Sequence, residues 1–138
     1  ARNSELKVTL PPGQVTAVSI ERQAAGKEYY FGRPDLAICP QDTVMSEDAT
    51  EVTVVVHNIG GGDAPKFAVR IIMDGEETVL DATAGPLEAP ADCVPRMLEL
   101  RWPVPDNLRG RQFTVVVDPA DEVLELFEGN NIVELPAG

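Results

Sequence analysis

The sequence predicts an all-β fold: a seven-stranded, antiparallel, immunoglobulin-like sandwich with an extra N-terminal hairpin. Three observations support this prediction. Hydrophobic residues make up 43% of the 138 positions, and Val is frequent among them, which favours strands. Twelve prolines and 11 glycines interrupt the chain at short intervals, as turns do. No helical crossover separates the apolar segments, so we expect one core between two antiparallel sheets.

The first 33 residues differ from the rest. Between Ser4 and Arg22 two alternating apolar segments, LKVTL and VTAVSIE, flank PPGQ, a pattern typical of a hairpin. Gln23 to Arg33 lose the alternation and read as a linker. Residues 1–33 are therefore expected to be either an added hairpin or the end of a preceding domain.

The regular domain, 34–138, begins with two predicted strands. Asp35 to Cys39 (DLAIC) form the first, and Glu51 to Asn58 (EVTVVVHN) form the second after a polar turn. Side chains alternate across a strand, so Val52, Val54 and Val56 should share one face. That face is expected to meet the core.

The third strand covers Lys66 to Asp74 (KFAVRIIMD). Its core face is predicted to carry Phe67, Val69, Ile71 and Met73. Asp74-Gly75 is a strong signal for a tight hairpin, from which Glu77 to Ala82 return as a short strand.

Three more strands complete the expected seven. Val94 to Trp102 place Leu98, Leu100 and Trp102 toward the core, and Pro103 ends the run. Gln112 to Asp118 and Asn131 to Leu135 follow. Their core residues are expected to be Phe113, Val115 and Val117 in the former strand.

Charge and hydropathy exclude two classes of partner. The chain has 11 basic and 23 acidic residues, a net charge of −12, which repels the phosphates that dominate nucleic-acid affinity. The longest apolar runs, such as Val115 to Val117, are far too short to span a bilayer. Neither nucleic acid nor a membrane span is expected.

The two cysteines leave two alternatives open. Cys39 and Cys93 lie 93 − 39 = 54 positions apart, and a bridge between them would close a long loop. Both are equally consistent with small, partly buried free thiols.

Nothing in the sequence indicates catalysis. The only histidine, His57, should lie opposite the buried valines, so at most one Ser-His or Cys-His pair can form. None of the serines lies in a nucleophile-elbow sequence. We expect no catalytic residue and no enzymatic activity.

A run of acidic residues is the main candidate site. It contains Asp118, Asp121, Glu122, Glu125 and Glu128, followed by Asn130 and Asn131. Calcium takes six to eight oxygen ligands of this kind, which makes Asp118, Asp121, Glu125 and Glu128 candidate ligands. The spacing is not that of an EF-hand loop. The alternative is a structural loop with no cofactor, in which carboxylates are solvated and the asparagines bond to backbone groups.

Two further features have a functional and a structural interpretation. Tyr29 to Phe31, with Trp102, could stack on sugars, although rings at a domain boundary more often pack the linker onto the sandwich. Gly60 to Gly62 lack the strand-to-helix setting of a phosphate loop. We expect them to form a strand-to-strand crossover with positive φ angles.

These segments resemble the CARDB family, the cell-adhesion-related domain of bacteria and archaea. The resemblance rests on PDLAI (Pro34 to Ile38), VTVVVHNIGGGDAPKFAVRIIMDG (Val52 to Gly75) and FTVVVDPADEVLELFEGNN (Phe113 to Asn131), about three quarters of the chain. It implies an immunoglobulin-like or fibronectin-III-like sandwich without catalytic residues.

The resemblance also implies a function. It suggests a secreted or cell-surface spacer or adhesion domain whose partners are neighbouring domains of the same polypeptide, with surface glycans or proteins as further partners. Separately, LPPGQVTAVSI near the N-terminus is similar to the end of a glycoside hydrolase C-terminal β-sandwich. Two alternatives therefore remain: a carbohydrate-binding accessory domain of a polysaccharide-degrading enzyme, and a calcium-stabilised structural domain.

Overall fold

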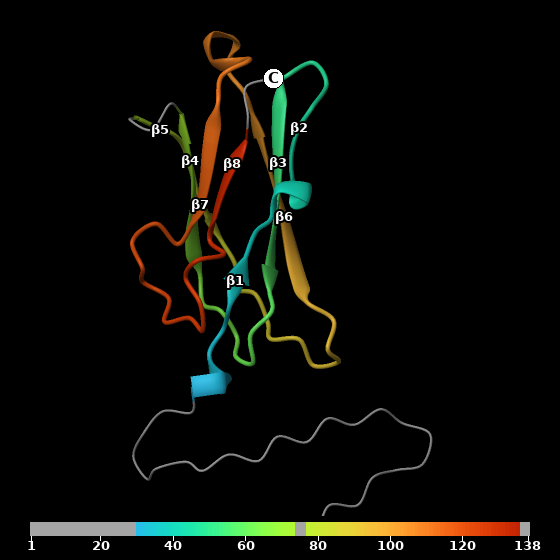
Figure 1. Ribbon diagram of the computed structural model, residues 1–138, viewed down its shortest axis with the longest axis vertical. Helices are drawn as coiled ribbons and strands as arrows, with labels where there is room; N and C mark the ends of the chain where they lie inside the picture. The colour runs from blue at the N-terminus through green and yellow to red at the C-terminus, as the bar shows by residue number, and fades with distance from the viewer. Residues whose placement is uncertain (1–29, 74–76, 136–138) are drawn as a thin grey trace, which may run out of the picture.

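The computed structural model describes residues 30–73 and 77–135, which form two antiparallel sheets packed face to face (Figure 1). The strands are β1 (Leu36–Ala37), β2 (Thr43–Met45), β3 (Glu51–Asn58), β4 (Phe67–Met73), β5 (Glu77–Ala84), β6 (Arg96–Pro103), β7 (Phe113–Val117) and β8 (Ile132–Leu135). Three short 3-10 helices accompany them: η1 (Tyr30–Gly32), η2 (Pro40–Asp42) and η3 (Asp106–Leu108). The predicted all-β sandwich is confirmed.

The two sheets have different construction. In the first, β3 pairs along its whole length with β6, while β1 and β2 share its other edge. The second has the order β5-β4-β7-β8. The predicted N-terminal hairpin and the Asp74-Gly75 turn lie outside the described residues. β4 and β5 nevertheless pair antiparallel on either side of that turn.

The core follows the predicted alternation. Burial alternates residue by residue along β3 and β4, so every second side chain enters the space between the sheets. The fully buried side chains from the two sheets include Val52, Val54, Val56, Val69, Ile71, Val115 and Val117. Trp102 on β6 is buried with them, while Leu98 and Leu100 are partly buried against this core.

The strand predicted at Asp35 to Cys39 is shorter than expected and is followed by a second short strand. Only Leu36 and Ala37 of the expected Asp35–Cys39 strand pair with β3, and the chain then turns through η2 before pairing with β3 again as β2. Pro40, at the start of η2, has no N–H to donate to a ladder, which ends the strand there. The described chain therefore has eight strands instead of seven.

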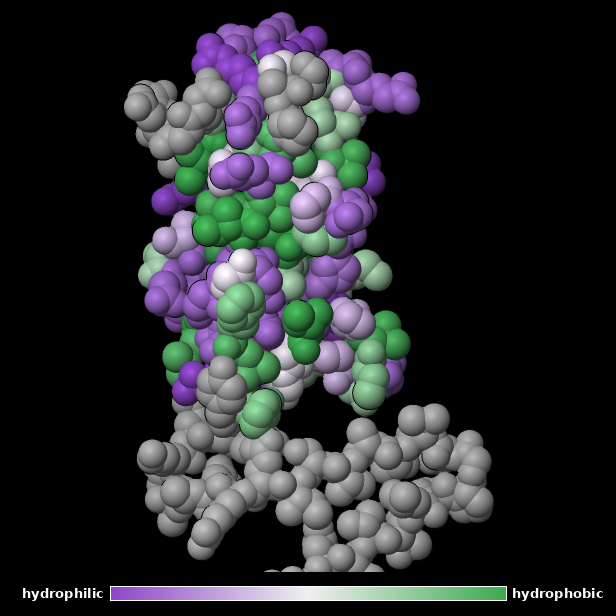
Figure 2. Space-filling model, viewed as in Figure 1, coloured by the Kyte–Doolittle hydropathy of each residue, from purple (hydrophilic) through white to green (hydrophobic). Residues whose placement is uncertain are grey.

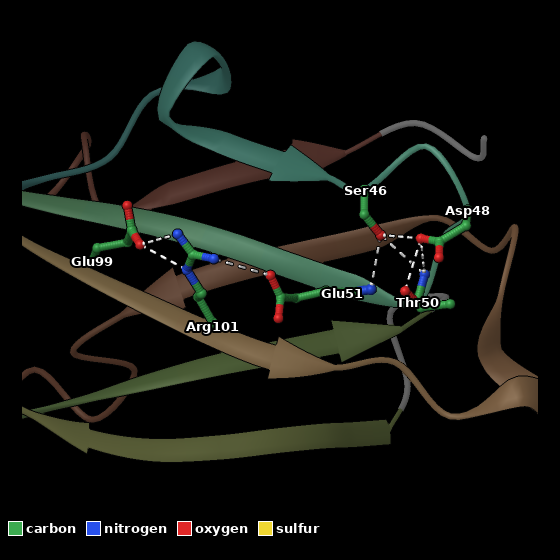
Figure 3. A network of polar contacts seen from close by, with 6 residues as sticks. All are labelled: Ser46, Asp48, Thr50, Glu51, Glu99 and Arg101. Atoms are coloured by element: carbon green, nitrogen blue, oxygen red, sulfur yellow. Dashed lines mark hydrogen bonds and ion pairs between the residues drawn. The ribbon is translucent and has the colours of Figure 1, made fainter.

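The two ends of the sandwich are closed by different polar contacts. At the upper end in Figure 1, the turn between β2 and β3 is held by Ser46, Asp48 and Thr50 (Figure 3). Asp48 Oδ1 accepts hydrogen bonds from both hydroxyls at 2.7 Å. These groups are largely exposed. Figure 2 shows hydrophilic residues gathered at this end, with hydrophobic surface visible in the middle of the same face.

Candidate functional site

The opposite end, where the described chain enters through η1, carries the acidic loop singled out from the sequence (Figure 1). We call it the entry end. The loop joins β7 to β8 and spans residues 118–131. Asp118 and Asp121 adopt positive φ angles of 47° and 53°. Asp118 Oδ2 accepts the Val123 N–H at 2.7 Å, so this buried carboxylate fixes the start of the loop.

Glu125 points inward, with only 4% of its surface exposed. One carboxyl oxygen accepts the Leu36 N–H, and the other accepts a hydrogen bond from Asn131 Nδ2 at 2.9 Å. The pKa of Glu125 is raised to about 7, chiefly by burial. The negative charges of Glu128 and Asp118 contribute to this rise, while the two hydrogen bonds oppose it. Glu125 therefore ties the loop to β1.

Backbone hydrogen bonds continue the same connection. The Leu126 N–H donates to the Pro34 carbonyl at 3.0 Å, and the Ile38 N–H donates to the Asn130 carbonyl at 3.0 Å. Asn130 Nδ2 donates to Asp35 Oδ1 at 2.7 Å. The loop thus holds residues 34–38 on the side away from β3.

Asn58, at the end of β3, fastens the other side of that segment. Its side chain is fully buried, with 0% exposed surface. Oδ1 accepts the N–H groups of Asp35 and Gly60 at 3.2 and 3.1 Å. Nδ2 donates to the carbonyls of Gly62, Leu87 and Glu88 at 2.9–3.1 Å. One side chain therefore joins three loops of the entry end.

Gly60 to Gly62 allow two backbone segments to pack closely. The prediction that these glycines adopt positive φ angles is wrong. Among the described glycines only Gly85 and Gly110 have positive φ. At Gly61 and Gly62 a Cβ would overlap the backbone oxygens of Phe31 and Gly32. The Gly61 and Gly62 N–H groups both donate to the Arg33 carbonyl, so two backbones approach here without room for side chains.

The four predicted calcium ligands do not all converge. A pocket of about 270 Å³ is lined by Asp118, Asp121 and Glu128, together with Asn131, while Glu125 is turned into the interior. Burial raises the pKa of Glu128, and the neighbouring Asp121 carboxylate raises it as well. Within residues 30–73 and 77–135, no three His, Cys, Asp or Glu side chains are arranged to hold a metal ion.

His57 lies on the outer face of β3, as its position opposite the valines predicted. Its Nε2 is 3.0 Å from Asp42 Oδ2, and the Cys39 thiol donates to the same oxygen at 2.8 Å. The thiol hydrogen bond lowers the pKa of Asp42, and His57 contributes to the same shift. Because the thiol faces the carboxylate, the geometry is not that of a Cys-His nucleophile pair.

Both cysteines are free thiols in this structure. Cys39 is partly buried in contact with Asp42, and Cys93 is exposed in the loop before β6. The possible Cys39–Cys93 disulfide is therefore not formed in this structure.

The aromatic residues are divided between core and surface. Trp102 is 8% exposed and belongs to the core, so it offers no ring face for a sugar. Phe31 is exposed at the entry end. Tyr29 lies outside the described residues. Phe127, on the acidic loop of the same end, is also exposed, so sugar stacking here would depend on Phe31 and Phe127 instead of Trp102.

The buried polar residues of the entry end were missed from the sequence, although one signal was present. Asn58 follows Val52, Val54 and Val56 at the same period of two, so alternation alone places it on the core face. Such a position requires hydrogen-bond partners. For Asp35 and Glu125 no comparable pattern exists, because their burial depends on segments that are distant in sequence.

In the described part of the chain, no helix has the length and apolar composition needed to cross a membrane.

Comparisons with known proteins agree with this architecture. The CARDB family model matches residues 33–135. No curated protein matches the chain. A CARDB domain from Pyrococcus furiosus, crystallised in complex with di-metal ions, is similar with a TM-score of 0.53 and 24% identity, covering 78% of this chain and 94% of that one.

A second similar structure comes from Methanosarcina acetivorans. It is the 272–376 domain of a protein described as a cell-surface protein, with a TM-score of 0.54 and 27% identity, covering 77% of this chain and 91% of that one. CARDB domains are non-catalytic, adhesion-related modules. Since the family model matches well over half of the residues of this chain, the chain belongs to the CARDB family.

Proposed function

We propose that this domain is a spacer in a secreted or cell-surface protein, holding neighbouring domains of the same polypeptide at a fixed separation. One observation carries the proposal: the described chain enters at η1 and leaves at the end of β8, at opposite ends of the sandwich (Figure 1). A module with this geometry adds its full length between its neighbours. The family and the Methanosarcina cell-surface relative support the location.

The spacer function is tested in the parent protein by replacement. The domain is deleted, or exchanged for an unrelated β-sandwich whose termini lie the same distance apart. A spacer predicts that deletion impairs the parent's surface activity and that the exchange restores it. If the exchange restores nothing, the surface of this domain itself binds a partner, and the adhesive role replaces the spacer role.

Binding of carbohydrate is a weaker proposal, since it rests on exposed Phe31 and on the N-terminal likeness to a glycoside hydrolase sandwich. Screening the chain on a glycan array tests it, with Phe31→Ala as the matched variant. Binding that persists unchanged in the variant would contradict stacking on this ring.

A calcium-stabilised loop is the third candidate. It is supported by the di-metal complex of the Pyrococcus relative and by the pocket that Asp118, Asp121 and Glu128 share. A divalent cation would relieve the repulsion that raises the pKa of Glu128, but it would have to draw these carboxylates closer together. Glu125 is no longer a ligand in this proposal, because both its oxygens accept other hydrogen bonds.

Thermal unfolding in EDTA and in millimolar calcium tests this candidate. Binding predicts a higher midpoint in calcium that Asp121→Asn abolishes, whereas Glu122→Gln, an exposed neighbour outside the pocket, retains it. Equal midpoints in EDTA and calcium would end the proposal.

A further inference from the structure

The segment 34–38 is held between two parts of the molecule that come from different sheets. On one side, Leu36 and Ala37 pair with the end of β3, and the Ile59 N–H donates to the Asp35 carbonyl at 2.9 Å. On the other side lies the loop 118–131, which leads directly into β8. The first described strand is thereby fastened to the last.

The contacts with the loop follow a parallel register. Pro34 is bonded to Leu126 and Ile38 to Asn130, so both segments advance in the same direction. Between these two backbone hydrogen bonds lie the Glu125 contact to the Leu36 N–H and the Asn130 contact to Asp35. Four hydrogen bonds thus span one short stretch.

The directions in which the two segments run determine how tension between the chain ends acts on these four hydrogen bonds. Residues 34–38 continue from the entry end, whereas β8 runs to the upper end, where the described chain stops (Figure 1). Tension between the two ends of the chain pulls these parallel segments in opposite directions along their length. The four hydrogen bonds then bear the tension together, instead of opening one after another as in an unzipping hairpin.

We propose that residues 34–38 and 125–130 form a shear clamp that gives this domain a load-bearing function along the polypeptide. The inference rests on the proposed spacer function and deepens it, because a spacer joined in series transmits tension between its neighbours. Release of the clamp is the first step of unfolding under end-to-end load. The buried contact of Glu125 with the Leu36 N–H holds the two segments in register before any load is applied, and Asn58 fixes Asp35 of the first segment to the end of β3.

Single-molecule unfolding at constant force tests the clamp, with the whole chain held by handles at its two termini. Asn130→Ala removes the hydrogen bond to Asp35 and retains the backbone bond to Ile38. We expect it to unfold about fivefold faster under this load, the equivalent of one hydrogen bond. Arg70→Ala is the matched control, since it removes an exposed pair with Asp81 in the other part of the second sheet. Its rate should be that of the wild type.

A second loading geometry separates the clamp from general stability. With the N-terminal handle moved to the exposed Glu47, residues 34–38 lie outside the loaded part of the chain. The clamp predicts that Asn130→Ala then has little effect on the unfolding rate. The clamp would be overturned if Asn130→Ala accelerated unfolding equally in both geometries, or if it did not accelerate unfolding under end-to-end load. Either result leaves the replacement test of the spacer unaffected, because that test applies no force.

Discussion

Polar side chains hold the loops at both ends of the sandwich, but they are exposed to water at one end and buried at the other. At the upper end Asp48 binds Ser46 and Thr50 in contact with water (Figure 3). At the entry end Asn58 and Glu125 bind backbone groups in the interior. A polar group lost at the surface is replaced by water, whereas one lost in the interior leaves its partners unsatisfied. The difference in burial therefore predicts where the fold is sensitive.

The largest effect is expected from Asn58→Ala, because two N–H groups and three carbonyls of the entry end lose a hydrogen bond. We expect a loss of about 4 kcal/mol in the free energy of unfolding, measured by denaturant titration. Val54→Ala, in the apolar core of the same strand, is the comparison and should lose about 2.5 kcal/mol. If the valine variant were the less stable of the two, polar contacts would not be what secures this end.

Close backbone packing at the entry end predicts the next effect. In Gly62→Ala the new methyl group would overlap the Gly32 oxygen, and the backbone must move, which should lower the stability by about 2 kcal/mol. Gly129→Ala is the matched control. The nearest atoms to its methyl group belong to the exposed ring of Phe127, which can rotate away. Equal denaturation midpoints for the two variants would refute the packing argument.

Glu125 makes the entry end sensitive to pH. Its pKa is raised from 4.5 to about 7, so the folded state holds the proton more tightly than the unfolded state does. The resulting stability is fully present below pH 4.5 and is lost as the pH rises through 7. Chemical denaturation at a series of pH values should show this decrease.

Two neighbours of Glu125 also carry charge, namely Glu128 and Asp118, and both contribute to the raised pKa. Glu125→Gln retains an acceptor for the Leu36 N–H but cannot ionise. The decrease between pH 5 and pH 8 should therefore be much smaller in this variant. A wild-type slope in Glu125→Gln would assign the pH dependence to another group.

The smallest effect is expected at the upper end. Asp48→Ala removes the acceptor of two hydroxyl hydrogen bonds, but water reaches the same groups. Its denaturation midpoint should be the least changed of the variants described above. A loss as large as that of Asn58→Ala would show that exposure does not explain the contrast between the two ends.

Much of the fold could be predicted from local pattern. The bounds of β3 agree with the prediction, and the alternating side chains of β3, β4 and β7 occupy the core as expected. The splitting of the first strand was missed, because its two parts are defined by pairing with β3. The acidic loop was recognised as a candidate site, but its composition indicated neither which carboxylate is buried nor what it binds.

Glu125 and Asp118 show which features could not be predicted from the local sequence pattern. Both are acidic residues in a polar loop, and nothing near them in sequence marks either as internal. Glu125 is buried because the loop folds back over the entry segment, where it meets the Leu36 N–H across 89 positions of sequence, and the Asp118 N–H donates to the carbonyl of Ala68 on β4. Contacts over such separations arise only when both sheets are assembled.

By itself, the sequence determined the class of fold, the face of most strands and the absence of a catalytic motif, because alternation and turn residues act over a few positions. Only the tertiary structure decided that the glycines allow two backbones to approach closely, and that the acidic loop is hydrogen-bonded to the first strand. The physical reason is that burial and hydrogen-bond partners depend on distant segments, which the local pattern of side chains does not encode.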